Sequence, residues 1–533
     1  MDTAATRTGS RWTPMVVYGA AQFLVVLDQA VMNVSISQLV DDFDTTVTVI
    51  QAVITLYALV MAMLMLTGGK LGDLLGRRRA FGLGMAIYGL GSALTAVSWS
   101  VLTLGLGWSI LEGIGAALVL PAMVALVAST YEGRDRVLAF ALLGGVAGVS
   151  IAVGPVLGGW LTTELTWRLV FVGEVVVTIA VLLALRVLPE DAPRSGASKP
   201  LDWVGSSLSA LGLGIIVLGT LNASVWGWIE PKASPIEPFG FALTPFVIGA
   251  GALALVGFGA WGRRRARLGQ SRLVRLELLS IPPLRAGLQG FLTQNIVLLG
   301  TFFVVPLYLQ LVQGLDALET GLRMVPVSMA MLLTSLGGSV LTRWLSPRAI
   351  VRGGFAVLAA ALAALIGAIE PTLDGWAFGT AMAALGVGMG LIASQLANVI
   401  QSAVDQADRS EAGGLQWTAQ QLGGSLGVAV IGAIVLSALA GNVIDLVEDD
   451  ARLAPQVREQ VTTQVSEGLD FVTIEQVSDA GQGAGLDATS VAALTEDYAE
   501  AQLFALKAGL LAALGLALLA LVLTRDLPSG TST

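Results

Sequence analysis

The stretch "VFVGEVVVTIAVLL" (residues 170–183) places one carboxylate, Glu174, in a run whose other thirteen residues are apolar, Gly or Thr. After Arg168 the run carries no base. A charge at the centre of a bilayer costs about 3 kcal/mol or more. The stretch therefore indicates a membrane-spanning helix in which a buried acid serves a purpose.

Composition supports a membrane setting. The chain is 55% apolar and 13% charged, with a mean hydropathy of +0.78, whereas a soluble domain is roughly 45–50% apolar and about 25% charged. It has no Cys, which excludes disulfides and thiolate chemistry, and no His, which removes a common metal ligand. Proton chemistry falls to carboxylates, and we expect no metal, no cofactor and no nucleic-acid partner.

Apolar runs of about 20 residues, the length that crosses a bilayer, recur along the whole chain. They predict an all-α polytopic membrane protein with fourteen transmembrane helices. The first apolar core is too long for a signal peptide. The expected spans lie near 14–39, 47–68, 80–99, 102–130, 137–161, 168–188, 203–224, 243–262, 284–312, 320–342, 349–369, 376–404, 410–440 and 500–524.

Basic residues set the orientation. With the N-terminus in the cytoplasm, 23 of the 29 Lys and Arg lie on the cytoplasmic side, so the positive-inside rule places both termini there. The net charge of −9 comes from residues 441–500, which hold thirteen acids and two bases. The segment 441–499 is then an extracellular loop, and a solvated loop is the simplest interpretation.

The gaps between spans divide the chain into three parts. An N-terminal six-helix bundle (1–188) precedes a linker and two-helix insert (189–283, with helices near 203–224 and 243–262). A C-terminal six-helix bundle (284–524) contains the loop 441–499 and is followed by a cytoplasmic tail (525–533). The gaps "GGKLGDLLGRRR" (68–79) and "GGSVLTRWLSPR" (337–348) resemble each other, and such repeats are typical of secondary transporters.

Three motifs carry a resemblance to a known family. "GKLGDLLGRRR" (69–79), "GVSIAVGPVLGG" (148–159) and "VLDQAVMNVSISQL" (26–39) resemble the 14-helix drug:proton antiporters of the major facilitator superfamily. The resemblance implies the major facilitator fold, two six-helix bundles plus two inserted helices. It also implies a monomer in the plasma membrane of a bacterium. This protein would export lipophilic, cationic or amphipathic compounds, and the proton gradient alone would drive the export.

The first motif forms a cytoplasmic latch in that family. Glycines let helices approach closely, and Asp73 and Arg77 are four residues apart, close enough to pair. The resemblance implies that this latch breaks when the two halves move, whereas the arginines that follow can simply anchor the topology. The later copy has Thr342 in place of Asp73. The expected latch residues are Gly69, Gly72, Asp73, Gly76, Arg77 and Arg78.

The second motif, Ser150, Gly154, Pro155, Gly158 and Gly159, is an antiporter motif in the family. Ser150, Gly154 and Gly158 share one helix face at four-residue spacing, and Pro155 loosens the backbone. Small residues at this spacing let helices touch, so simple packing explains the pattern as well as function does. The resemblance implies that this face lies against the partner half and seals the pathway.

Three acids lie inside spans: Asp28, Glu112 and Glu174. Burial favours the neutral form of a carboxyl group, so these residues can load and release protons or neutralise a cationic substrate. Asp28 matches the acid of the family's first-helix motif, although a purely structural role stays open. The family usually has Arg at Ser109, Gln at Glu112 and Asn at Glu174, so the change favours a cationic cargo. Glu174 faces either the cargo or its own bundle.

Neutral polar residues provide candidate cavity lining. Many such side chains only join helices together. The candidates are Asn33, Gln289, Asn295, Gln395, Asn398, Gln416 and Gln420.

Other classes fit less well. The only "GGK" is followed by Leu71 rather than Ser or Thr, so an ATP-binding loop is excluded, and a chain without His or Cys is a poor enzyme candidate. A lipid or metabolite exporter of the same fold is the nearest alternative. A channel or a non-transporting membrane sensor also stays open.

Overall fold

The computed structural model describes residues 12–131, 133–188, 201–342, 344–405, 409–467 and 469–529. The expected linker from 189 to 200 and both chain ends lie outside these residues. Within them, every predicted span coincides with a helix, and no strand occurs.

Twelve of the described helices are long and apolar enough to cross a membrane. The predicted spans near 80–99 and 320–342 are also helices, α4 (Arg77–Ala96) and α13 (Ala317–Leu341), but they are not among the twelve. Three arginines and several glycines lower the hydropathy of α4. The all-α fold is therefore confirmed, and the count of fourteen spans stays a prediction.

The first helices form an N-terminal block (residues 12–188). In it α1 packs on α7, α3 packs on α6, and α4 lies between α6 and α8. Its elements are α1 (Thr13–Val34), α2 (Ile36–Asp42), α3 (Val47–Leu75), α4, α5 (Val101–Leu104), the π-helix η1 (Gly105–Glu112), α6 (Gly113–Thr130), α7 (Gly133–Glu164), α8 (Arg168–Leu183) and the 3-10 helix η2 (Ala184–Val187).

The C-terminal block (residues 282–529) repeats this kind of packing. Its α15 lies against α13 and α14, while α12, α16 and α19 pack on one another. The elements are α12 (Pro282–Leu307), the π-helix η5 (Tyr308–Val312), α13, α14 (Pro347–Ala368), α15 (Gly375–Ser402), α16 (Arg409–Asp449), α17 (Pro455–Glu467), α18 (Ile474–Gly483) and α19 (Ala488–Leu523).

The two blocks meet along α7 with α13 and along α3 with α16. Side chains also bridge them. Ser37 Oγ donates to Gln310 Oε1 at 2.7 Å, and Gln310 Nε2 donates to the Val34 carbonyl at 2.8 Å. Gln51 Nε2 donates to the Val428 carbonyl at 2.9 Å. These bonds satisfy buried amides across the interface, where an unpaired polar group would be costly.

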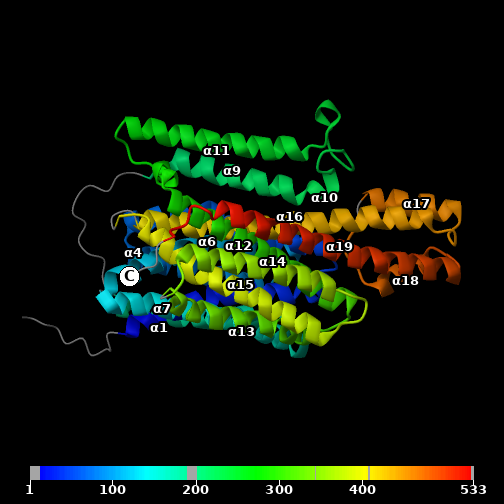
Figure 1. Cartoon of the computed structure of the whole chain (residues 1–533), viewed down its shortest axis with the longest axis horizontal. Coiled ribbons are helices and arrows are strands. Elements are labelled where there is room, and N and C mark those ends of the chain that lie inside the picture. Colours follow the sequence, from blue (N-terminus) through cyan, green and yellow to red (C-terminus); the bar gives the residue numbers. More distant parts are fainter. Residues whose placement is uncertain are drawn as a thin grey trace, which may run out of the picture.

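The two-helix insert forms a separate layer along one side of the body (Figure 1). Its elements are α9 (Trp203–Leu221), α10 (Ala223–Trp226), the 3-10 helix η3 (Pro238–Gly240), α11 (Thr244–Arg267) and the 3-10 helix η4 (Leu276–Ser280). One side of α9 packs on α11, and another packs on both α3 and α16. Leu213 and Val217 of α9 join Leu59 and Ala429 in one small apolar cluster. The insert therefore touches both blocks at once.

The segment predicted as a solvated loop is mostly helical. At one end of the molecule, α16 and α19 continue beyond the bundle and carry α17 and α18 (Figure 1). Gln502 Nε2 donates to the Val472 carbonyl at 2.6 Å, and Phe471 is buried. The alternation of apolar runs with acids thus reflects short helices that have one packed face. We call this end the capped end.

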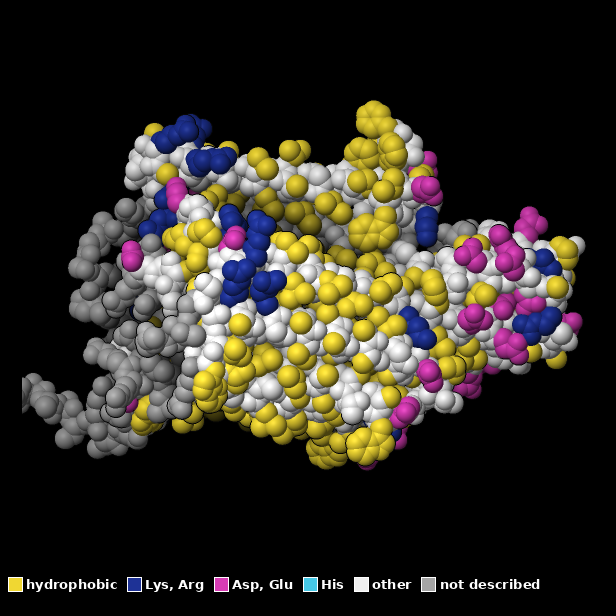
Figure 2. Space-filling view, viewed as in Figure 1, with side chains coloured by type: hydrophobic (Ala, Val, Ile, Leu, Met, Phe, Trp, Pro, Cys, Tyr) yellow, Lys and Arg dark blue, Asp and Glu magenta, His cyan; other side chains and the backbone are white. Residues whose placement is uncertain are grey.

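Charge separates along the long axis. Acids gather on the capped end, and most of the visible Lys and Arg lie toward the opposite end, which we call the basic end (Figure 2). The basic end corresponds to the side predicted to be cytoplasmic.

A charged clamp closes the N-terminal block near the capped end. Asp42 accepts hydrogen bonds from Trp167 Nε1 at 2.8 Å and from Arg168 Nη1 at 2.9 Å, and Gln38 donates to it at 2.8 Å. Partial burial alone would raise the pKa of Asp42, but these three hydrogen bonds outweigh it and hold the pKa below the usual 3.8. The clamp ties the end of α2 to the start of α8.

We expect Asp42→Asn to lower the melting temperature by about 1–3 °C at neutral pH, because a partly exposed ion pair contributes on the order of 1 kcal/mol or less. The folded-state pKa is depressed, so this stabilisation is complete above the unfolded pKa and is lost as the pH falls through the folded value. The difference from wild type is therefore constant above about pH 5 and shrinks below it. Thermal unfolding in detergent checks this, with Asp44→Asn as the control; a difference that grows on acidification contradicts it.

Candidate functional site

Asp28, Glu112 and Glu174 come together inside the N-terminal block. They lie on α1, η1 and α8, and one carboxylate oxygen from each lies within 4.8 Å of the others. Asp28 and Glu112 are 0% exposed and Glu174 is 1% exposed. We call these three residues the carboxylate triad. Of the two orientations left open for Glu174, the structure shows that it faces its own bundle.

The π-helix η1 supplies two of the groups. Trp108 and Glu112 both belong to η1, and residues four apart lie close to the same face of a helix. Trp108 Nε1 lies 2.8 Å from both oxygens of Asp28, and the Trp108 ring stacks on Tyr57 at 4.9 Å between centroids. A π-helix is rare and is frequently found at functional sites. Here it places the indole N–H of Trp108 and the carboxyl group of Glu112 beside Asp28.

Helix α4 holds the other two acids. Ser92 Oγ donates to Glu174 Oε2 at 3.0 Å, and Thr95 Oγ1 donates to Glu112 Oε1 at 3.3 Å. Between them, a Cβ on Gly91 would lie 2.6 Å from Cγ of Glu112, so only glycine leaves room for this side chain. Glu112 Oε2 and Glu174 Oε1 are buried and accept no hydrogen bond. The triad therefore keeps unused acceptor capacity.

No Lys or Arg forms an ion pair with the triad in the part of the chain that the structure describes. Carboxylates this close in a low-dielectric interior cannot all be ionised, because each charge opposes the next. The cluster must therefore hold protons or a cation. Three acidic oxygens at this spacing also have the geometry of cation ligands; the expectation that no metal binds stays a prediction.

Several residues of the site were not found from the sequence. Ser92, Thr95 and Tyr88 of α4 and the ring of Trp108 contact the triad, yet none stands out in an apolar run. Small polar residues every three or four positions on α4 were the available signal. Such spacing alone does not say which neighbouring helix the face meets.

The antiporter motif contacts two different partners. A Cβ on Gly154 would lie 2.4 Å from Cβ of Ala30, and a Cβ on Gly158 would lie 2.8 Å from Val31. Both glycines thus pack on α1 of their own block, and the expectation that their face meets the partner half is wrong. Ser150, on the same face, is buried and bonds its own helix through the Val146 carbonyl.

The adjacent face of α7 meets the partner block instead. A Cβ on Gly159 would lie 2.3 Å from the carbonyl oxygen of Ala317, and a Cβ on Gly321 would lie 2.1 Å from the carbonyl oxygen of Pro155. Successive residues of a helix point about 100° apart, so residues 155 and 159 form a second face beside 154 and 158. Helix α7 therefore lies between α1 and α13.

The latch glycines lie at the junction of α3 with α4. Gly76 has φ of +102°, a conformation that favours glycine, and a Cβ on Gly69 or Gly72 would contact Pro121 or Ala80 at ordinary distance. Arg77 Nη1 donates to the Ala125 carbonyl at 3.2 Å, which ties the junction to α6. The side chain of Asp73 lies outside the described residues, so its pairing with Arg77 and the role of Arg78 stay predictions.

The predicted cavity residues differ in position. Asn33 and Gln395 are buried and donate to backbone carbonyls, of Gln29 at 2.7 Å and of Gly338 at 3.1 Å. The Gln395 bond joins α15 to α13, which favours the helix-joining role for Gln395, whereas the Asn33 bond stays within α1 and joins no helices. Four further candidates are half-buried and one, Asn398, is exposed; the half-buried ones are Gln289, Asn295, Gln416 and Gln420.

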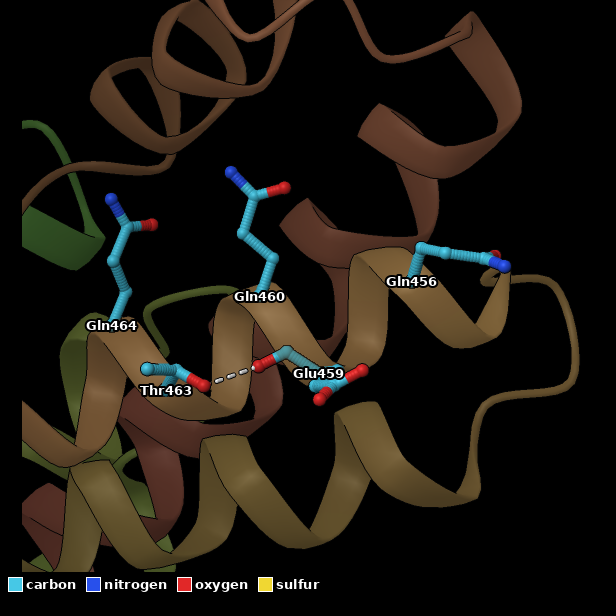
Figure 3. Close-up of a pocket in the computed structure, with 5 residues that line it drawn as sticks. All are labelled: Gln456, Glu459, Gln460, Thr463 and Gln464. Atoms are coloured by element: carbon cyan, nitrogen blue, oxygen red, sulfur yellow. Dashed lines mark hydrogen bonds between the residues drawn. The ribbon is translucent and has the colours of Figure 1, made fainter.

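A pocket on the surface of α17, at the capped end, is not a candidate for the transport site. Figure 3 shows it along α17, with Thr463 Oγ1 donating to the Glu459 carbonyl at 2.8 Å. All of its lining residues come from this one helix outside the bundle: Gln456, Glu459, Gln460, Thr463 and Gln464. A single helix surface cannot enclose a cargo.

Two helical blocks joined along α7–α13 and α3–α16, with a buried acidic cluster in one block, define a polytopic secondary transporter. Residues 18–428 match the family model described as the Major Facilitator Superfamily. The chain belongs to this superfamily, which confirms the family predicted from the motifs and places the protein in a cell membrane.

Curated relatives are antibiotic export and resistance proteins. The puromycin resistance protein pur8 of Streptomyces alboniger is 32% identical over 451 residues, which cover 82% of this chain and 84% of the relative. The tetracenomycin C resistance and export protein of Streptomyces glaucescens is 29% identical over 430 residues, covering 80% of this chain and 77% of the relative. Both relatives come from Streptomyces, and one of them is named as an export protein.

Solved structures share the fold. A bacterial homologue of the human lysosomal transporter Spinster, in an inward-facing and occupied conformation, has a TM-score of 0.60 at 18% identity, covering 98% of this chain and all of that one. A D-xylose–proton symporter has a TM-score of 0.57 at 12% identity, covering 97% and 98%. At these identities the likeness extends to the fold alone.

We expect Trp108→Phe to lower the melting temperature, because Asp28 loses its donor and a buried unsatisfied group costs about 1–3 kcal/mol. In an Asp28→Ala background the same change should cost clearly less, because the acceptor is gone. Thermal unfolding of the four proteins measures this coupling, with the exposed Trp376→Phe as control. Strict additivity would show that the hydrogen bond contributes nothing.

We expect Gly159→Ala to separate the blocks beside α13, because the new Cβ meets a backbone carbonyl that cannot rotate away. Since the chain has no Cys, crosslinking of Ser37→Cys with Gln310→Cys reports the contact cleanly, and its yield should fall. Gly144→Ala, on the same helix with open space around it, is the control. An unchanged yield in both variants argues against a tight α7–α13 contact.

Proposed function

We propose that this protein exports lipophilic, antibiotic-like compounds in exchange for protons, and that the carboxylate triad carries the coupling protons. The observation that carries the proposal is the convergence of three buried acids from three helices without a basic partner in the described part of the chain. The names of the relatives support the substrate class. The proton gradient is then the sole energy source, with no cofactor, and the working unit is a monomer in the bacterial plasma membrane.

Proton release from the triad has to be compensated. A cluster that loses a proton gains a charge in a low-dielectric interior, which is costly until water, a donor or a cation approaches. Because the triad is fully buried in this conformation, release requires a rearrangement of the helices around it. This requirement links the protonation state to the conformation.

Helix α7 offers the mechanical connection. The segment of α1 that carries Asp28 fits against Gly154 and Gly158, while the next face of α7 meets α13 of the other block. A small shift of α1 on deprotonation therefore presses on the helix that holds the blocks together. Packed interiors respond to such shifts by switching between discrete arrangements.

The negative triad also favours a cationic or amphipathic cargo. With the family's usual Arg replaced by Ser109, whose Oγ donates to the Val53 carbonyl at 2.7 Å, the block carries acids without a fixed counter-charge. In this proposal the cargo acts on the triad through its electric field and through the positions of the helices, since the three acids are buried here.

The test is proton release from the purified protein on addition of a lipophilic cation or of puromycin, together with gradient-driven uptake into proteoliposomes. Asp28→Asn should abolish release and coupled flux, because the titrating group is lost while its shape stays. Asp202→Asn, a buried acid of the insert outside the triad, is the matched control and should retain both.

Two results would contradict the proposal. Release at the wild-type level by Asp28→Asn would remove Asp28 from the coupling pathway. Absence of gradient-dependent flux for the wild type with a broad panel of cationic and neutral compounds would argue against proton-coupled drug export as a whole.

A further inference from the structure

The end of α11 carries an unusual density of arginine. From residue 263 to 275 the chain has six arginines and no acid. Four of them fall in the last turns of α11, at the basic end, and the dark-blue side chains at this tip of the insert are visible in Figure 2. The question is which of these charges the protein itself neutralises.

Three of the six arginines have acidic partners. Arg265 Nε lies 3.7 Å from Asp202 Oδ2. Arg272 Nη1 lies 2.6 Å from Glu277 Oε1, and Arg275 Nε lies 3.0 Å from Glu411 Oε2. These pairs tie the start of α9, η4 and α16 to the end of the insert.

The other three arginines are exposed and have no acidic partner among the described residues. Arg263, Arg264 and Arg267 form no ion pair and donate no hydrogen bond to any described residue; Arg264 only lies over the ring of Trp261, at 5.8 Å. Exposed cations in the last turn also gain from the helix dipole, but that is worth only about 0.3–1 kcal/mol each. The dipole alone does not account for three exposed guanidinium groups at one end of the insert.

The surroundings are those of a membrane interface. Trp203 at the start of α9 is 68% exposed, and Leu268 just after α11 is 60% exposed. Asp202 accepts from Trp261 Nε1 at 2.9 Å, which brings the start of α9 beside the end of α11. Exposed tryptophan and leucine next to free arginine are typical of the headgroup level of a bilayer.

We propose that Arg263, Arg264 and Arg267 bind the phosphate groups of anionic phospholipids in the leaflet at the basic end. Guanidinium groups match phosphate with paired hydrogen bonds, and basic residues directly beyond a membrane helix attract anionic lipid. Trp203 and Leu268 contact the acyl region of the same lipids. Since α9 packs on both blocks, the bound lipids fix the depth of a layer that both blocks touch.

The experiment titrates the full-length protein, purified in neutral detergent, with phosphatidylglycerol and separately with phosphatidylcholine, and measures lipid retention by native mass spectrometry and the melting temperature. Phosphatidylglycerol alone should bind saturably and stabilise. In the triple variant Arg263→Gln/Arg264→Gln/Arg267→Gln its half-saturating concentration should rise by on the order of tenfold to a hundredfold. The triple Arg→Lys variant keeps the charge but loses the paired hydrogen bonds, so its half-saturating concentration should lie between those of the wild type and the Gln variant. Lys232→Gln/Arg323→Gln, which changes two exposed bases near the capped end, should bind like the wild type.

Several outcomes overturn the proposal. Unchanged phosphatidylglycerol binding by the Gln variant would mean that these arginines only fix the topology. Equal responses to both lipids would mean that no anionic site exists, and displacement of the lipid by soluble glycerol phosphate would point to a free phosphate site instead. None of these readouts uses transport, so the result is independent of the proposed export function.

Discussion

The structure depends on one electrostatic constraint, the burial of three carboxylates side by side without a base of their own. Repulsion between them would be severe if all were ionised. Bound protons must therefore neutralise part of the charge, and the side chains that contact the acids are neutral hydrogen-bond donors. Trp108, Ser92 and Thr95 each direct a hydrogen atom at one acid. Gly91 leaves the space in which Glu112 sits. Residues of η1 and α4 thus surround acids that membrane helices usually avoid.

The triad lies beside a local irregularity of the chain. Residues 105–112 form a π-helix, and its Trp108 and Glu112, four residues apart, both lie at the site. The glycine face of α7 then lets α1 approach closely enough for its acid to join them. Close helix approach through small residues replaces the hydrophobic driving force that lipid does not provide.

The sequence predicted what depends on composition and length. Spans, basic gaps and motifs located the helices, and the acids were recognised because a charge in an apolar run is conspicuous. Their convergence could not be predicted, because it depends on which faces of α1, η1, α4 and α8 meet. The contact of Gly154 with α1 was missed for a related reason: four-residue spacing defines a face but not its partner. Helices α17 and α18 at the capped end were missed because their many acids are typical of a solvated loop.

The apolar contact between α9 and the two blocks has a mechanical consequence. In the described residues no hydrogen bond joins α9 to α3 or α16, and the contact consists of side chains such as Leu59, Leu213, Val217 and Ala429. Dispersion contacts are weak one by one and have little directional preference, so they can be exchanged for one another as surfaces slide. The insert can therefore stay in contact with both blocks if they shift relative to each other, because no directional bond between them has to break.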